Sequence, residues 1–287
     1  MKIGVIDVGG GYRGIYAAGV LDCCMKNNVK FDFGIGISAG AANLISYSAG
    51  QYKRNFKFYS EYGLRKEYAS ISNFIKKKNF LDLDYIYSTL SNSDGENPFD
   101  YEAAMTNPME LYFLATDAIT GRSKYFTKEE VPKDDYSILK ASCAIPFVCQ
   151  PQAVCGDVYF DGALADPVPV EKAFKMGCDK VVLILTRPEN EIRQVGHDDF
   201  LAGRIIRKYP LAAGRMLTKA ERYNEEVAIA KLYAKQGKVL IIAPDDTCGV
   251  GTIKGKKENL VRLYEKGLRD GEKITTFTNS DNDLSPL

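Results

Sequence analysis

The feature that most constrains this chain is a short glycine-bounded segment, Gly36-Ile37-Ser38-Ala39-Gly40, directly after the apolar stretch 31–35. This order is typical of a nucleophile elbow, a sharp turn from a strand into a helix that exposes one hydroxyl. The glycines are needed because the strained turn leaves no room for side chains beside the serine. Ser38 would then lie at a helix N-terminus, where backbone N–H groups and the helix dipole favour negative charge.

Length and composition are those of an ordinary globular protein. The 287 residues, 45% hydrophobic and 26% charged, suffice for one large α/β domain or for a domain with an appendage. A net charge of +1 gives no whole-chain reason to expect nucleic acid as a partner. No apolar run reaches the roughly 20 residues that span a bilayer, and residues 1–6 are too short for a signal-peptide core. Because the seven cysteines form no Cys-x-x-Cys pair, we expect reduced thiols, no zinc and a cytoplasmic location.

Strand and helix signals alternate along the chain. Strands are predicted at 2–8, 31–37, 158–160, 180–186 and 238–243, a β-hairpin at 110–127, and helices at 14–27, 39–51, 170–176 and 211–236. Pro210 is expected to break the helical stretch that precedes it. This alternation predicts a three-layer α/β/α fold around a mainly parallel sheet.

The chain divides into three predicted parts. Residues 1–190 would form the α/β domain, within which 52–100 is interpreted as exposed helices and loops over the strand ends. Residues 191–275 would form a helical extension with a last strand, and 276–287 a disordered polar tail. The three lysines at 76–78 are interpreted as a solvated face.

A second glycine motif lies between the first predicted strand and helix: Gly9-Gly10-Gly11-Tyr12-Arg13-Gly14. Consecutive N–H groups at such a turn form a nest for an anion, which in acyl transfer is the tetrahedral oxyanion. The same residues satisfy G-x-G-x-x-G, so an alternative function is binding of a nucleotide or phosphate. A dinucleotide site needs an acidic residue at the end of its second strand, whereas Asp32 lies at the beginning of that strand. This position argues against the dinucleotide interpretation.

The candidate base is the aspartate of Asp161-Gly162-Ala163. Such a carboxylate can simply cap a turn, but the following Asp-Pro-Val-Pro at 166–169 stiffens the loop, and an activated serine needs a base within reach. The chain has one histidine, His197, and the order Ser38, Asp161, His197 matches that of α/β-hydrolase triads. Because His197 lies in the polar segment 189–199, we expect a Ser38–Asp161 dyad and keep the triad as the alternative. Burial would have to raise the pKa of Asp161, since aspartate is a poor base in water.

Together, the three motifs resemble those of the patatin-like phospholipase family. Further segments support the resemblance, which covers nearly the whole chain: 5–14 with 18–22, 141–146, 166–169, 186–188, 222–224 and 263–267. The last three are similar to a bacterial branch with a helical C-terminal extension.

The resemblance implies a serine acyl hydrolase of the phospholipase A or lysophospholipase type. Ser38 would be the nucleophile, Asp161 the proton acceptor, and N–H groups around Gly10 and Gly11 the oxyanion hole. Arg13 would steady the glycine loop or contact a phosphate. Family enzymes need no metal or cofactor and release fatty acid from glycerolipids through an acyl-serine intermediate. Aromatic residues of 52–100 could wall an apolar cleft, form a lid or pack a helical layer, and a lipid substrate implies peripheral membrane contact.

Overall fold

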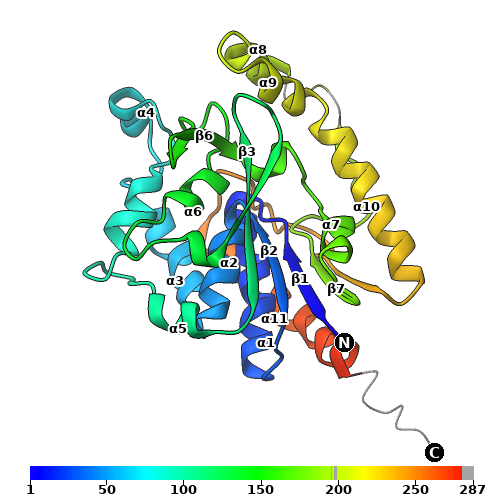
Figure 1. Cartoon of the computed structure of the whole chain (residues 1–287). Helices are drawn as coiled ribbons and strands as arrows, with labels where there is room; N and C mark the ends of the chain where they lie inside the picture. Colours follow the sequence, from blue (N-terminus) through cyan, green and yellow to red (C-terminus); the bar gives the residue numbers. More distant parts are fainter. Residues whose placement is uncertain (195, 197–198, 280–287) are drawn as a thin grey trace, which may run out of the picture.

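An eight-stranded sheet lies at the centre of the computed structural model, which describes residues 1–194, 196 and 199–279 (Figure 1). The strand order is β5-β6-β3-β2-β1-β7-β8, with β4 paired to β3. The strands are β1 (Ile3–Asp7), β2 (Phe33–Ile37), β3 (Glu110–Asp117), β4 (Ser123–Thr127), β5 (Gln152–Val154), β6 (Asp157–Asp161), β7 (Lys180–Ile184) and β8 (Val239–Ile242). β1, β2, β3, β7 and β8 pair in parallel, and β4, β5 and β6 pair antiparallel. The predicted mainly parallel sheet and the hairpin of β3 and β4 are confirmed.

Helices cover both faces of this sheet (Figure 1). One face carries α1 (Gly14–Lys26), α2 (Ala39–Ser48) and α11 (Lys257–Asn279), whereas α7 (Val170–Lys175) and α10 (Lys219–Lys235) lie on the other. Alternate residues of β1 supply the two cores: Val5 belongs to the first cluster and Ile6 to the second. Strands buried on both faces are expected of a parallel sheet. The three-layer fold is therefore confirmed.

The long helix α11 has no counterpart among the helices that the sequence pattern predicts. It packs along α1, and a Cβ atom on Gly267 would lie 2.1 Å from the carbonyl oxygen of Tyr16. The Tyr264 hydroxyl also donates to Asp22 at 2.7 Å. Leu260, Leu263 and Ile274 are buried on one face of α11 at helical spacing, a signal that our sequence reasoning missed. Because α11 extends to Asn279, residues 276–279 of the predicted tail are helical, and the rest lie outside the described residues.

The remaining α-helices are shorter. They are α3 (Arg54–Ser60), α4 (Ile71–Lys77), α5 (Tyr101–Thr106), α6 (Ser137–Ser142), α8 (Asp199–Ile205) and α9 (Pro210–Leu217), with a π-helical turn at Tyr85–Leu90. Among them, α5 lies at the amino end of β3 (Figure 1). Pro210 is the first residue of α9, where its missing N–H costs nothing, and α8 already ends at Ile205. The helix predicted over 211–236 is divided at Thr218 into α9 and α10. Within the described ranges, no helix is long and apolar enough to cross a bilayer.

Candidate active site

Ser38 lies at the turn from β2 to α2, with φ 55° and ψ −130°. This conformation is strained for a residue with a side chain. The flanking glycines allow close packing of the turn: a Cβ atom on Gly40 would lie 2.2 Å from the Asp7 carbonyl oxygen, and one on Gly36 would lie 2.6 Å from the Ala41 Cα. The Ser38 N–H donates to the Ser142 hydroxyl at 3.0 Å. Ser38 thus occupies a sharp turn between a strand and a helix.

The glycine loop after β1 has three consecutive positive φ angles, 66°, 130° and 60° at Gly9, Gly10 and Gly11. A Cβ atom on Gly11 would lie 2.0 Å from the carbonyl oxygen of Thr252, to which the Tyr12 N–H donates at 3.0 Å. Among the described residues, no loop hydrogen bond engages the N–H of Gly10 or Gly11. Both glycines line the same pocket as Ser38.

Asp7 connects the glycine loop to the elbow, a role that our sequence reasoning missed. Its buried carboxylate accepts hydrogen bonds from the Gly9 N–H and from the Asn43 side chain, both at 2.9 Å. Asn43 also donates to the Gly14 carbonyl at 3.0 Å. Burial raises the pKa of Asp7 to about 6, and the two hydrogen bonds limit that rise. An aspartate at the end of an otherwise apolar strand is the signal that could have identified it.

Asp161 ends β6, and its carboxylate is buried beside the Ser38 hydroxyl. One carboxylate oxygen accepts from the Ala163 N–H at 2.9 Å, and a Cβ atom on Gly162 would lie 2.2 Å from the Leu114 carbonyl oxygen. Burial raises the pKa of Asp161, while the charge of Lys219 and hydrogen bonds from Ser38 and Ala163 lower it. The fold therefore brings together two side chains that are 123 positions apart in sequence (161 − 38).

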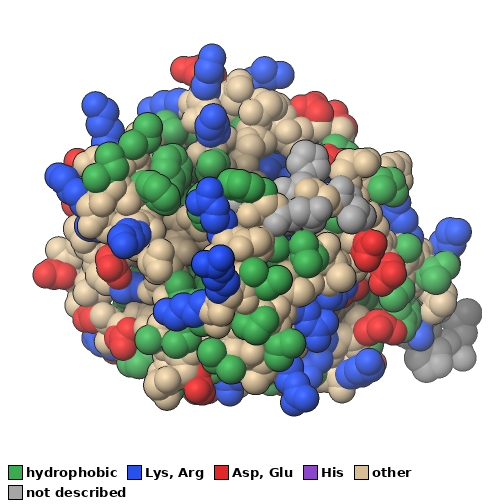
Figure 2. Space-filling view, turned by 90° about the horizontal axis from the view of Figure 1, so that it is seen from above, with side chains coloured by type: hydrophobic (Ala, Val, Ile, Leu, Met, Phe, Trp, Pro, Cys, Tyr) green, Lys and Arg blue, Asp and Glu red, His purple; other side chains and the backbone are tan. Residues whose placement is uncertain are grey.

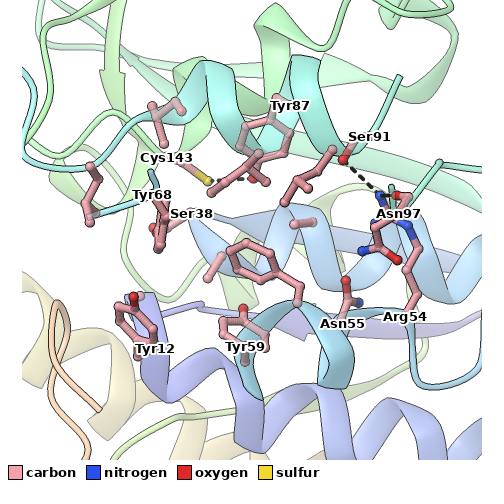
Figure 3. Close-up of a pocket in the computed structure, with 18 of the residues that line it drawn as sticks. Tyr12, Ser38, Arg54, Asn55, Tyr59, Tyr68, Tyr87, Ser91, Asn97 and Cys143 are labelled. Atoms are coloured by element: carbon pink, nitrogen blue, oxygen red, sulfur yellow. Dashed lines mark hydrogen bonds between the residues drawn. The ribbon is translucent and has the colours of Figure 1, made fainter. Parts of the chain in front are cut away.

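Two pockets meet at Ser38. The first, here called the apolar pocket, is lined mainly by residues of 54–97 together with Tyr12, Ala39, Ala42 and Cys143 (Figure 3). Phe58, Tyr59 and Tyr87, aromatic side chains of 52–100, line this pocket. Tyr59 and Tyr87 also belong to the buried core, together with Tyr62 and Tyr85.

The second, here called the polar pocket, contains Asp161 and the glycine loop. Its other polar lining includes Arg13, Thr186, Arg187, Arg193, Lys219, Tyr223 and Thr252. Ser38, Gly11 and Ile145 line both pockets. The serine hydroxyl thus lies where an apolar cavity meets a charged one.

The other candidate residues lie elsewhere. Asp32 accepts a hydrogen bond from the Ile3 N–H at 2.8 Å, at the end of β1 opposite the glycine loop. His197 lies outside the described residues. All seven cysteines are free, and the part of the chain that the structure describes holds no group of three His, Cys, Asp or Glu residues suited to a metal ion.

Residues 8–174 match the family model of patatin-like phospholipases. The chain belongs to the patatin-like phospholipase family. All three motifs of the site fall inside the matched region. Residues 209–276, which include α9, α10, β8 and most of α11, match a second model described as a domain of unknown function (DUF6363).

Several known proteins are similar to this chain. An uncharacterized protein of Escherichia coli, YjjU, is 29% identical over 202 residues, which are 65% of this chain and 52% of YjjU. Lysophospholipase NTE1 of Yarrowia lipolytica and that of Debaryomyces hansenii are each 23% identical over 70% of this chain, but the match covers only 14% and 13% of their lengths. The chain therefore spans about half of one relative and about a seventh of the others. Among solved structures, VipD of Legionella pneumophila is similar with a TM-score of 0.48 and 14% identity, covering 95% of this chain and 66% of VipD.

Proposed function

We propose that the protein is a serine hydrolase that cleaves the acyl ester of a glycerolipid, as phospholipases A and lysophospholipases do. The observation that carries this proposal is the position of Ser38, whose hydroxyl meets the buried Asp161 carboxylate where the apolar and polar pockets join. Membership of a phospholipase family and similarity to two lysophospholipases support a lipid ester as substrate.

In the proposed reaction, Asp161 accepts the hydroxyl proton while the Ser38 oxygen attacks the ester carbonyl. The N–H groups of Gly10 and Gly11 donate to the oxyanion, and each such donor contributes about 3 kcal/mol to transition-state stabilisation. Collapse of the tetrahedral intermediate breaks the ester C–O bond, and Asp161 returns its proton to the departing alcohol. Water then attacks the acyl-serine by the same route and releases the fatty acid. The raised pKa of Asp161 makes it a better proton acceptor than an aspartate in water.

The apolar pocket would hold the acyl chain. Its wall combines aliphatic side chains such as Leu83 and Ile86 with the rings of Phe58 and Tyr68 (Figure 3). Burial of an alkyl chain against such a wall contributes about 0.8 kcal/mol per methylene group.

We propose further that the face beside α4 and α8 contacts the lipid surface. Ile71, Ile75 and Phe200 are strongly exposed there, and the Phe74 ring lies 6.1 Å from that of Phe147, two residues from Ile145 of the pockets. Figure 2 shows this end of the molecule, where apolar side chains lie among Lys and Arg side chains. Because the exposed isoleucines adjoin the lysines at 76–78, we now include that run in the lipid-facing surface. A cytoplasmic location, inferred from the seven free thiols, stays a prediction.

A serine-reactive fluorophosphonate probe tests the proposed function. The unchanged protein should be labelled, Ser38→Ala should not, and Ser72→Ala, which removes an exposed hydroxyl on α4, should be labelled like the parent. Asp161→Asn should lose turnover of p-nitrophenyl butyrate by at least about 10³-fold, a loss of the size expected when the only base is removed. Absence of labelling together with tight binding of a nucleotide would favour the alternative function of the glycine loop.

A further inference from the structure

The polar pocket carries more positive charge than ester hydrolysis by a serine and an aspartate requires. Among the described residues, its lining holds four basic side chains, those of Arg13, Arg187, Arg193 and Lys219, and one carboxylate, that of Asp161. Glu191 lies outside the lining and pairs with Arg187. The cationic excess therefore lies within one cavity beside the Ser38 hydroxyl.

Arg13 shows that this charge is built into the fold. Its side chain is 7% exposed, and one guanidinium nitrogen donates to the Thr252 hydroxyl at 3.1 Å. The Nε–H has no hydrogen-bond partner among the residues that the structure describes. Burial, and to a smaller degree the charges of Arg187 and Arg193, lowers the pKa of Arg13 to about 10, so the group stays charged at neutral pH. A buried donor without an acceptor is costly, and an anionic ligand would remove that cost.

The C-terminal segment completes the same cavity. Lys219 and Tyr223 come from α10 and Thr252 from the loop after β8, all within the region that matches the domain of unknown function. Thr252 also fixes the glycine loop, since its carbonyl oxygen accepts from the Tyr12 N–H. The charge of Lys219 lowers the pKa of Asp161, which places its ammonium group within electrostatic reach of the base.

We propose that the polar pocket is a leaving-group subsite for a phosphate-bearing alcohol of net negative charge, and that the segment 209–276 supplies part of it. This inference rests on the proposed function, because the phosphate must belong to the alcohol that departs from the acyl-serine. Guanidinium groups match phosphate oxygens in a two-point fork, and a lysine adds a point charge. A choline group on that phosphate would instead place a further positive charge beside the four basic side chains of the pocket. The subsite therefore favours an acylglycerol phosphate over its neutral or zwitterionic analogues.

Three substrates with one acyl chain test the selectivity: 1-oleoylglycerol 3-phosphate, 1-oleoylglycerol and 1-oleoylglycerophosphocholine. We expect kcat/KM to be at least about tenfold higher for the phosphate than for either analogue. In Lys219→Gln and Arg193→Gln this preference should fall at least about fivefold, and Lys219→Arg should restore most of it. The control is Lys235→Gln, which removes an exposed lysine of the same helix and should keep the parent's preference.

Two further measurements separate recognition of the phosphate group from the effect of Lys219 on the pKa of Asp161. Inorganic phosphate should inhibit the parent competitively and inhibit Lys219→Gln more weakly, which shows whether the phosphate group alone is recognised. Lys219→Gln should also raise the apparent pKa of the acidic limb of the rate profile, since it removes a charge that lowers the pKa of Asp161. Equal rates on the three substrates, or a preference for the choline ester, would overturn the subsite while Ser38-dependent labelling upholds the hydrolase. Loss of labelling in the parent would overturn both.

Discussion

Each of the two pockets at Ser38 is lined by an arginine, buried Arg13 in one and half-buried Arg54 in the other. The hydrogen bonds of these two side chains differ, and the difference distinguishes a structural role from ligand binding. In the apolar pocket, Arg54 donates to the hydroxyls of Ser46 and Ser91 at 3.0 and 2.9 Å and to the carbonyl of Asn97 at 2.8 Å. In the polar pocket, Arg13 has one such bond, to Thr252, and an unpartnered Nε–H among the described residues. Burial lowers the pKa of both to about 10. Arg54 stabilises the wall of the apolar pocket through its hydrogen bonds. Arg13 has an N–H group, unpartnered among the described residues, that can donate to an anion.

Of the variants that compare the two pockets, Gly11→Ala should have the largest effect, because Gly11 lines both. In Gly11→Ala the new Cβ would lie 2.0 Å from the Thr252 carbonyl oxygen, so the glycine loop must move. We expect kcat/KM for p-nitrophenyl butyrate to fall by about 10²- to 10³-fold, the loss that follows displacement of an oxyanion donor. Gly50→Ala is the matched control: its φ of 67° is similar, but its Cβ would meet nothing within 4 Å. It should cost about 1 kcal/mol of stability and little activity; similar losses from both variants would show that strain alone is responsible.

Replacement of each arginine by methionine sharpens the comparison directly. Arg54→Met leaves several buried acceptors without a donor and should lower the free energy of unfolding by about 2 to 4 kcal/mol. Arg13→Met should cost less stability, because it also removes an unpaired donor, but should lower kcat/KM on the acylglycerol phosphate by about tenfold or more. Urea denaturation and substrate kinetics on both variants provide the measurements. The distinction between the two arginines fails if Arg13→Met proves the less stable variant and retains the parent's substrate preference.

Local patterns predicted the parts of the site that the backbone itself determines. The elbow at 36–40 and the glycine loop at 9–14 follow from contacts of glycines with nearby backbone, and apolar runs predicted the strands of the sheet. Lys219 and Thr252 could not be found in this way, because packing of α10 and of the loop after β8 brings them to the glycine loop from more than 200 positions away. Long-range packing thus determines which residues surround the two turns that the local sequence predicts.

Outside the two pockets, Asp166 and Glu226 form a half-buried carboxylate pair that lines a separate pocket. Glu226 accepts from the Val168 N–H at 2.6 Å in the loop after Asp161, and burial, with the nearby Asp166, raises the pKa of Glu226 to about 8. Between its ordinary pKa near 4.5 and about 8, the folded state keeps a proton that the unfolded state loses. The free energy of unfolding should therefore fall as pH rises through this window.

Glu226→Gln keeps an acceptor for the Val168 N–H without the charge. At about 1.4 kcal/mol per pKa unit, it should raise the free energy of unfolding at pH 8.5 by roughly 2 to 4 kcal/mol and flatten the pH dependence. Urea denaturation at pH 5.5, 7.0 and 8.5 measures both effects. The adjacent exposed Glu225 is the control, since Glu225→Gln should leave the slope as it is. An unchanged slope in Glu226→Gln would mean that this carboxylate titrates normally in the folded protein.

The smallest effect is expected from His197→Ala, and this variant decides whether the polar side needs a third catalytic group. A triad would place an imidazole between the serine and the aspartate, whereas in the proposed dyad Ser38 and Asp161, which line one pocket, exchange the proton directly. A base in direct contact needs no relay, so turnover of p-nitrophenyl butyrate should stay within about threefold of the parent, while Asp161→Asn abolishes it. If His197→Ala keeps its melting temperature but loses activity as completely as Asp161→Asn, the dyad is wrong. The cationic side of Ser38 would then also hold the general base, and the charge of Lys219 would act on an imidazole as well as on a carboxylate.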